Sequence, residues 1–372
     1  MNRENEAMSS TTSRLFGTTL MLCLGVVGFY PSSPSHALTP VEELYAELAK
    51  LPDDERRKRL VDGARKEGRV VLINTTSGSQ GVRHLAVFTK RYPEIKAERG
   101  EINVDRASET IVAETKAGRH ISDGLSLSNS DMGEVLKLGI AARYPTPVTK
   151  RVLPEYSGAL DPEHRWVPYK INEQGMSYNP RMIESLGLAP PKSYMDLCDP
   201  QYKGQVSFDA PSLRVLAGFN AILGEEGTRK FLECMGKNEP IVIRGLTART
   251  LLMMAGDHAI QGVNTMYSGI ALNKKNPAKA PYQPVWSAPV MIYPTSMVIN
   301  SRAPHPHAAA LFVDWNLDDE SQEVISGWGR GNVTEKHPFF PPEATLVVFG
   351  LVDDAVKDRL YDYWFKSIGA QK

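Results

Sequence analysis

Small hydroxyl and amide side chains gather in three turns of this 372-residue sequence, and each turn follows an apolar run and precedes a helical pattern. The residues are Thr75, Thr76 and Ser77 in the first turn, Ser128 and Asn129 in the second, and Ser212 in the third. The start of a helix presents backbone N–H groups and the positive end of the helix dipole, which bind anionic groups. Capping of its own helix explains any one turn equally well. Because such turns recur in both halves of the chain, we predict that they bind a carboxylate, phosphonate or phosphate group.

Arg244 offers a guanidinium in a similar place, because it follows the strand-like residues 241–243 and directly precedes Gly245. A planar guanidinium there can form a bidentate pair with an oxyanion. A solvated surface arginine, or one paired with a neighbouring carboxylate, accounts for the same pattern. Arg244 is therefore a predicted ligand contact with an open alternative.

Cys198 and Cys234 are candidate nucleophiles, because covalent catalysis needs a thiolate beside a base. The carboxylates of Asp196 and Asp199 flank Cys198 and disfavour a thiolate there. A disulfide between the two cysteines and separate burial as reduced side chains are both compatible with the sequence. The sequence holds no Ser-His-Asp signature, Gly-rich phosphate loop or metal-spaced histidine pair. We predict a protein that is not an enzyme, with no catalytic residues, no cofactor and no metal site.

The elements that must position these residues are strands alternating with helices. Strand-like runs at residues 70–73, 123–127 and 206–208 precede the three turns. This alternation predicts an α/β fold with mostly parallel sheets covered by helices. Two extended stretches, residues 169–178 and 290–300, interrupt the alternation, and we interpret them as passages between two lobes.

The N-terminus has the order of a secretory signal peptide, in which Arg14 precedes an apolar run from Leu15 to Tyr30 and small residues ending at Ala37. The run is short for a membrane-spanning helix, which needs roughly 20 apolar residues. We predict cleavage after Ala37 and a periplasmic location, with an uncleaved anchor as the alternative. The predicted parts are a signal peptide (residues 1–37), a first lobe (residues 38–170 with 297–372) and a second lobe (residues 171–296).

The charge balance excludes one class of partner. The chain has 43 basic and 43 acidic residues, so its formal net charge is zero. Without a basic stripe there is no large counterion-release contribution to binding. We therefore expect no nucleic-acid partner.

Several short motifs occur in a characteristic order between about Gly68 and Ile325. They are Gly68-Arg-Val-Val-Leu, Phe88 to Tyr92-Pro93, Tyr178-Asn179-Pro180, Pro191-Lys-Ser-Tyr-Met-Asp-Leu, Tyr202-Lys-Gly, Ala255-Gly256-Asp257 and His305-Pro-His-Ala-Ala. In this order the sequence resembles the periplasmic solute-binding proteins of ABC transporters, in the group of ferric-iron, thiamine and phosphonate binders. The resemblance implies a type 2 periplasmic binding fold: two lobes, each a mostly parallel sheet flanked by helices, with two hinge crossings and ligand in the cleft. It also implies a small-molecule ligand and a permease partner in the inner membrane, and we expect a monomer.

The resemblance also bears on the ligand. Tyr267 lies where similar proteins supply a tyrosine ligand, and it is a further predicted ligand-binding residue. Ferric-binding members carry adjacent tyrosines, whereas this chain has Met266-Tyr267, and its first two turns lack the histidine and carboxylate usual there. We therefore predict an anionic or zwitterionic solute. Ferric-iron transport, and an enzyme of the same fold with a cysteine nucleophile, remain alternatives.

Overall fold

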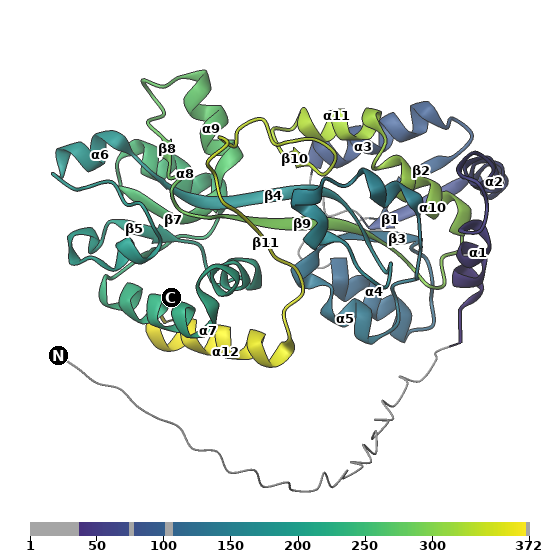
Figure 1. Cartoon of the computed structure of the whole chain (residues 1–372), viewed down its shortest axis with the longest axis horizontal. Helices are drawn as coiled ribbons and strands as arrows, with labels where there is room; N and C mark the ends of the chain where they lie inside the picture. The colour runs from purple at the N-terminus through teal and green to yellow at the C-terminus, as the bar shows by residue number, and fades with distance from the viewer. Residues whose placement is uncertain (1–36, 74–77, 101–106, 370–372) are drawn as a thin grey trace, which may run out of the picture. The chain divides into compact units, whose positions relative to one another are not determined.

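The computed structural model describes residues 37–73, 78–100 and 107–369 (Figure 1). Residues Leu38–Lys372 form one compact unit. The predicted signal peptide lies outside the described residues, except for Ala37. Each helix in the described ranges is too short or too polar to traverse a bilayer.

Strands and helices alternate along the chain, which confirms the predicted α/β class. The strands are β1 (Arg69–Ile73), β2 (Lys96–Arg99), β3 (Gly124–Ser128), β4 (Val167–Tyr178), β5 (Val206–Phe208), β6 (Ile241–Val242), β7 (Ile260–Thr265), β8 (Gln283–Pro284), β9 (Val290–Ile299), β10 (Gly331–Asn332) and β11 (Leu346–Val348). The α-helices are α1 (Pro40–Leu48), α2 (Asp53–Glu67), α3 (Gly78–Arg91), α4 (Ala107–Lys116), α5 (Gly133–Lys137), α6 (Pro180–Ser185), α7 (Leu213–Lys237), α8 (Leu246–Ala255), α9 (Met266–Lys275), α10 (Pro306–Trp315), α11 (Asp319–Ser326) and α12 (Asp354–Ser367). Short 3₁₀ helices include η2 (Asn129–Asp131) and η5 (Met195–Cys198).

Two long antiparallel strands, β4 and β9, form the middle of the sheet, whose order is β2-β1-β3-β9-β4-β7-β5-β6. On one side β1 pairs in parallel with β2 and β3, and on the other β5 pairs in parallel with β6 and β7. The strands β3 and β7 join β9 and β4 in antiparallel pairs. The two predicted extended stretches thus coincide with the strands that connect the two parallel wings (Figure 1).

Two large apolar clusters lie within this unit. One includes Trp315 of α10, and the other includes Phe208 of β5 and Phe219 of α7. Helix α12 packs against α7, and its Trp364 belongs to the second cluster (Figure 1). The boundaries of the lobes stay a prediction, and this packing favours grouping the C-terminal helix with residues 171–296.

Glycines end or interrupt helices where the sequence suggests it. Helix α2 ends at Gly68, whose left-handed conformation (φ 69°) is the usual glycine cap. In α7, Gly224 has φ 70° and ψ 170°, so the helical path breaks directly after Leu223. The chain then resumes a helix as far as Lys237.

The first half of β4 alternates between an apolar and a polar face. Tyr169 and Ile171 belong to the first apolar cluster. Lys170 and Asn172 project from the opposite face, because successive side chains of a strand point to opposite sides. A β-bulge between Pro168 and Lys170 shifts the register with β9. Bulges re-aim side chains beside binding sites, and this polar face borders the cavity described next.

Candidate functional site

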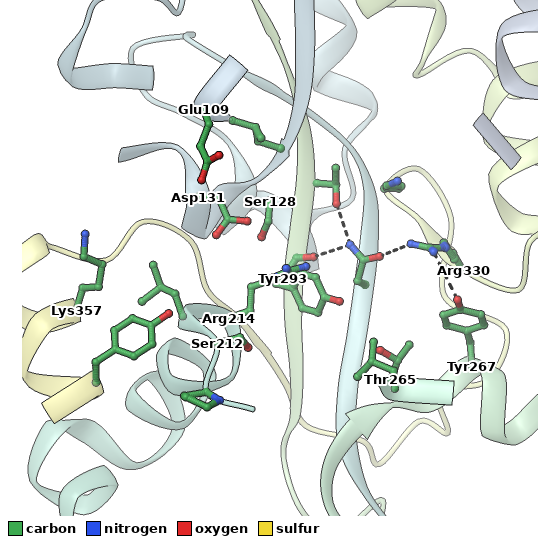
Figure 2. A pocket seen from close by; sticks show the side chains of 18 residues that line it. Glu109, Ser128, Asp131, Ser212, Arg214, Thr265, Tyr267, Tyr293, Arg330 and Lys357 are labelled. Carbon is green, nitrogen blue, oxygen red and sulfur yellow. Dashed lines mark hydrogen bonds between the residues drawn. The ribbon is translucent and has the colours of Figure 1, made fainter. Parts of the chain in front are cut away.

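A cavity of about 770 Å³ lies against the polar face of β4 and is lined from both wings of the sheet (Figure 2). Its charged lining residues are Glu109, Asp131, Lys170, Arg214, Arg330 and Lys357. Its other polar lining residues are Ser128, Asn172, Ser212, Thr265, Tyr267, Tyr293, Thr295 and Tyr361. The carboxyl ends of β3 and β7 reach this cavity, which is where open α/β sheets bind ligands.

Arg330 is held at the cavity by two side chains. Its Nη1 donates to Asn172 Oδ1 at 2.7 Å, and its Nη2 donates to the Tyr267 hydroxyl at 3.5 Å. The guanidinium carbon lies 5.3 Å from the centre of the Tyr267 ring. Asn172 is fixed in turn, because its Nδ2 donates to Thr295 Oγ1 at 2.8 Å. These contacts orient a guanidinium that can pair with two oxygens of one anion.

Lys170 is a second basic residue in the cavity, and it is only 2% exposed. It lies two residues before Asn172 on the same face of β4. Its Nζ is 5.2 Å from the centre of the Tyr169 ring. Burial lowers the pKa of Lys170 well below its usual value, and the charge of Arg330 lowers it further.

Asp131 and Arg214 bring opposite charges to the same part of the cavity. Burial raises the pKa of Asp131, whereas the charge of Arg214 and a 3.4 Å hydrogen bond from Ser130 Oγ oppose the rise. The guanidinium carbon of Arg214 lies 5.9 Å from the centre of the Tyr293 ring. Arg214 therefore has both an acidic and an aromatic neighbour at the cavity wall.

The charges are distributed unevenly around the cavity. Figure 2 shows Glu109 and Asp131 on one side, and Arg330 with Tyr267 on the other. Lys357 of α12 reaches the cavity and lies with its Nζ 3.0 Å from Asp354 Oδ1. Among the described lining residues, basic side chains outnumber carboxylates by four to two. The cavity thus favours a solute with an anionic group.

Glu173 fixes the first turn of α9, which carries Tyr267. Its Oε1 accepts a hydrogen bond from Tyr267 N at 3.0 Å, and its Oε2 is 3.9 Å from His337 Nε2. Burial raises the pKa of Glu173 to about 8 and lowers the pKa of His337 to about 4. Both groups are therefore mostly uncharged at neutral pH, and Glu173 anchors the backbone of Tyr267 without adding a charge to the cavity.

Three of the predicted ligand contacts, Ser128, Ser212 and Tyr267, line the cavity. The predicted residues of the first turn, Thr75, Thr76 and Ser77, lie outside the described residues. Their roles in binding remain predictions.

Asn129 is 1% exposed and does not line the cavity. Its Nδ2 donates to Ala159 O at 3.0 Å, and its Oδ1 accepts from Ser296 Oγ at 2.5 Å. Both ends of the amide thus bond to protein groups, which makes Asn129 a brace between η2 and β9 in this structure.

Arg244 is exposed and does not line the cavity. It follows β6, which lies at the edge of the sheet, and Gly245 with φ 102° turns the chain there into α8. The local pattern suggested a strand followed by a turn, but it could not show that this strand is an edge strand. The second wing instead contributes Arg214, two residues after Ser212.

Several lining residues were missed by the sequence reasoning, namely Lys170, Asn172, Arg214, Arg330 and Lys357. The alternation of apolar and polar residues over 167–172 was a usable signal for Lys170 and Asn172, because it predicts a strand with one polar face. Arg214 stands next to a predicted turn. Arg330 and Lys357 had no local signal, because they lie on a loop and on α12, far along the chain from the other lining residues.

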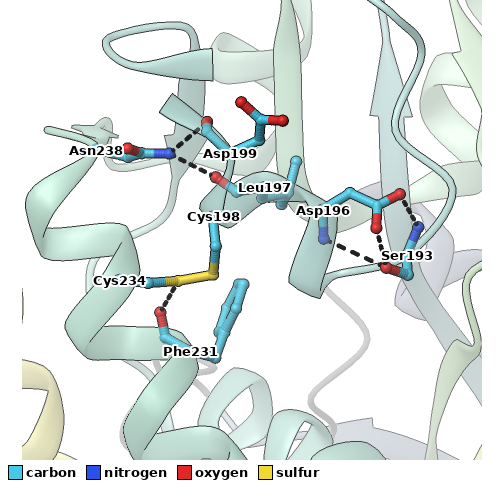
Figure 3. Close-up of a disulfide and its surroundings, with 8 residues drawn as sticks. All are labelled: Ser193, Asp196, Leu197, Cys198, Asp199, Phe231, Cys234 and Asn238. Atoms are coloured by element: carbon cyan, nitrogen blue, oxygen red, sulfur yellow. Dashed lines mark hydrogen bonds between the residues drawn. A yellow bond between two sulfur atoms is a disulfide. The ribbon is translucent and has the colours of Figure 1, made fainter. Parts of the chain in front are cut away.

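Cys198 and Cys234 form a disulfide, with their Cα atoms 5.4 Å apart (Figure 3). The bridge joins η5 to α7, and Asn238 Nδ2 adds 2.8 Å hydrogen bonds to the carbonyl oxygens of Leu197 and Asp199. Neither cysteine is among the described lining residues of the cavity. A sulfur in a disulfide is not a thiolate, so this pairing argues against the cysteine-nucleophile alternative.

Replacing both cysteines with serine should lower the free energy of unfolding by about 2–4 kcal/mol, because the unfolded chain regains the entropy of an open loop. The bridge spans a sequence separation of 36 residues. Urea unfolding followed by tryptophan fluorescence measures the change. Dithiothreitol should destabilise the wild type and leave the double variant unchanged; equal stability of both proteins without reductant would contradict the prediction.

Comparison with known sequences supports a common family. The model of the family described as bacterial extracellular solute-binding protein matches residues 126–350. An uncharacterized protein of Haemophilus influenzae is 29% identical over 203 residues. That match covers 53% of this chain and 56% of the relative, so it spans about half the length of each.

Solved structures show the same fold at low sequence identity. Iron-bound HitA from Pseudomonas aeruginosa superposes with a TM-score of 0.65 at 17% identity, covering 80% of this chain and 99% of HitA. The periplasmic binding protein AfuA from Actinobacillus pleuropneumoniae, with exogenous fructose-6-phosphate bound, gives 0.62 at 21% identity, covering 82% and 99%. These likenesses confirm the type 2 periplasmic binding fold. Because the family model covers more than half of the sequence, this chain belongs to the bacterial extracellular solute-binding protein family.

Proposed function

We propose that this protein is the periplasmic substrate-binding component of an ABC transporter and that its cavity captures a small anionic or zwitterionic solute for uptake. The observation that carries the proposal is the cavity of about 770 Å³ with four basic lining side chains between the two wings of the sheet. The partner would be a permease in the inner membrane. Cleavage of the signal peptide after Ala37 would release the protein into the periplasm.

The geometry of Arg330 supports an anionic group in the solute. Two protein contacts hold its guanidinium, and its Nε is buried without a hydrogen-bond partner among the described residues. A ligand oxygen that accepts a hydrogen bond from this Nε would satisfy the donor. Glu109 and Asp131 on the other side of the cavity allow for a positive group elsewhere in the same solute.

The elements that line the cavity support closure of the two wings around a solute. Ser128 ends β3 in one wing, Ser212 and Arg214 lie at the start of α7 beside the other, and β4 and β9 run between them. A solute that contacts both wings stabilises the arrangement in which both are close. Binding would therefore shift the protein toward a closed state by hinge motion at the two crossing strands.

The ferric-iron alternative is less well supported by this cavity. Burial raises the pKa of Tyr293 and Tyr361, which disfavours the phenolates that Fe(III) needs. The described residues contain no group of three or more His, Cys, Asp or Glu side chains that could hold a metal. The guanidiniums of Arg214 and Arg330 also repel a trivalent cation.

A binding panel tests the proposal directly. Purified mature protein is mixed with sulfate, phosphate, methylphosphonate, citrate, spermidine and ferric citrate, and thermal stability and calorimetric heat are measured. We expect at least one anion to raise the melting temperature and to bind with a defined Kd, and spermidine to have no effect. Tight ferric binding that is lost in Tyr267→Phe would favour the iron alternative, and binding of spermidine alone would overturn the proposal.

A further inference from the structure

Asn172 holds Arg330 at the cavity without supplying a counter-charge. Its side chain is 6% exposed, and its Oδ1 accepts from Arg330 Nη1 at 2.7 Å (Figure 2). The guanidinium also contacts the hydroxyl and the ring of Tyr267, which bring no carboxylate. Among the residues that the structure describes, no carboxylate forms an ion pair with Arg330. The positive charge is therefore left for a solute to balance.

The orientation of the Asn172 amide follows from its neighbours. A guanidinium only donates hydrogen bonds, so the amide oxygen must face Arg330. The amide nitrogen then donates to Thr295 Oγ1 at 2.8 Å and to the backbone oxygen of Tyr293 at 3.4 Å, both on β9. A backbone carbonyl only accepts, so one orientation satisfies both ends of the amide. Asn172 thus joins β4, β9 and the segment before β10 through one neutral group.

The carboxyl groups near this part of the cavity have other positions or partners. Glu173 follows Asn172 on β4, but its Oε1 accepts from Tyr267 N at 3.0 Å. Burial raises the pKa of Glu173 to about 8, against a smaller opposing effect that includes the charge of Arg330. Glu109 and Asp131 lie on the other side of the cavity from Arg330 (Figure 2). These groups do not replace an anionic solute beside the guanidinium.

The core of the same protein holds another arginine by a carboxylate. Asp314 Oδ2 lies 2.6 Å from Arg56 Nη2, and Asp314 Oδ1 accepts from Thr146 Oγ1 at 2.8 Å. None of these three residues lines the cavity. In both places an arginine and a threonine contact one short side chain, and only the charge of that side chain differs. A carboxylate completes the pair in the core, whereas the amide of Asn172 leaves the arginine charge unbalanced at the cavity.

We propose that Asn172 sets the charge preference of the cavity, because it orients Arg330 with a neutral amide and leaves the counter-charge to the solute. This inference rests on the proposed binding function and adds a specificity-determining residue to it. An aspartate at this position has the same shape and accepts from both the guanidinium and the Thr295 hydroxyl. It would supply the missing negative charge from within the protein, so an anionic solute would lose its partner.

Asn172→Asp tests the proposal, because it changes the charge and keeps the shape. Calorimetric titrations of the mature wild type and the variant use sulfate, phosphate, methylphosphonate and citrate as probes. Each anion that binds the wild type should bind the variant more weakly by a factor of about ten or more, because the new carboxylate neutralises Arg330 and repels the anion. Without ligand, urea unfolding should show similar stability, since the new charge-assisted hydrogen bond offsets the desolvation of the carboxylate.

Two control variants separate charge from shape. Asn276→Asp adds the same charge at the exposed C-terminal end of α9, outside the cavity lining, and should bind as the wild type does. Asn172→Leu removes the hydrogen bonds and adds no charge. It should be less stable than the wild type and bind anions less than about tenfold more weakly, because Arg330 keeps an unbalanced charge.

The outcomes separate this inference from the proposed function. Undiminished anion binding by Asn172→Asp overturns the inference and leaves the proposed function intact. A loss of affinity in Asn172→Leu as large as that in Asn172→Asp shows that Asn172 is only a brace between strands, which also overturns it. If Asn172→Asp does not fold, Asn172→Leu decides alone, and a loss well beyond tenfold contradicts the inference. If none of the four anions binds the wild type, the proposed function fails and the inference fails with it.

Discussion

Replacing Arg330 with methionine is expected to weaken binding of an anionic solute by about 10- to 100-fold. Hydrogen bonds to a charged partner contribute roughly 1.5–3 kcal/mol, which corresponds to that range of Kd. Methionine keeps much of the side-chain volume and removes the charge and all donors. The guanidinium is already oriented by Asn172 and Tyr267, so little of its binding energy is lost to ordering the side chain. Isothermal titration with the anion selected by the panel measures the effect.

Two matched variants make this result specific. Arg302 is exposed and lies outside the cavity lining, so Arg302→Met should bind the anion as the wild type does. Arg330→Lys should fall between the wild type and Arg330→Met, because an ammonium keeps the charge but not the two-pronged geometry. If Arg330→Met and Arg302→Met bind equally well, Arg330 is not a ligand contact.

Replacing Asp314 with alanine is expected to lower the free energy of unfolding by about 3–5 kcal/mol, because it leaves a buried arginine without its counter-charge. Asp314 Oδ2 is 2.6 Å from Arg56 Nη2, and their side chains are 0% and 4% exposed. Its Oδ1 accepts 2.8 Å hydrogen bonds from the hydroxyls of Tyr144 and Thr146. The carboxylate therefore joins α10, α2 and the segment before β4 within the first apolar cluster.

Urea unfolding of Asp314→Ala beside the wild type measures this loss. Asp314→Asn keeps one acceptor oxygen without the charge and should be less destabilised. Glu226→Gln removes a partner of Arg229 on the exposed face of α7 and should leave the unfolding midpoint unchanged, because solvent screens exposed pairs. An Asp314→Ala protein as stable as Glu226→Gln would show that the buried network contributes nothing.

The sequence predicted the fold well where its signals were local. The runs at residues 169–178 and 290–300 were recognisable as extended, and they became β4 and β9. The end of α2 at Gly68 could be predicted from the sequence, because a left-handed helix cap favours glycine. The position of α12 was not predictable, because the apolar face of Val356, Leu360 and Trp364 fits a partner in either lobe. Only packing against α7 decides it.

The candidate site likewise contains residues that the sequence predicts correctly and others that it does not. The turns around Ser128 and Ser212 each follow the carboxyl end of a strand, β3 in one wing and β5 in the other, and both residues line the cavity. Arg244 had an equivalent local pattern but follows an edge strand. Asn129 had the right residue type, yet its amide bonds to Ala159 and Ser296. Residue type and spacing thus named candidate positions, and strand order selected among them.

By itself, the sequence determined the α/β class, the two crossing strands and the hydroxyl-bearing turns, because hydrophobic periodicity and turn chemistry are properties of neighbouring residues. The tertiary structure alone decided that Cys198 and Cys234 are bridged, and that Arg330 and Lys357 join Lys170 around one cavity. Those groupings depend on contacts between segments far apart in the chain. Such contacts are fixed by how the sheet orders its strands and how the helices pack on it, which no local pattern of residues encodes.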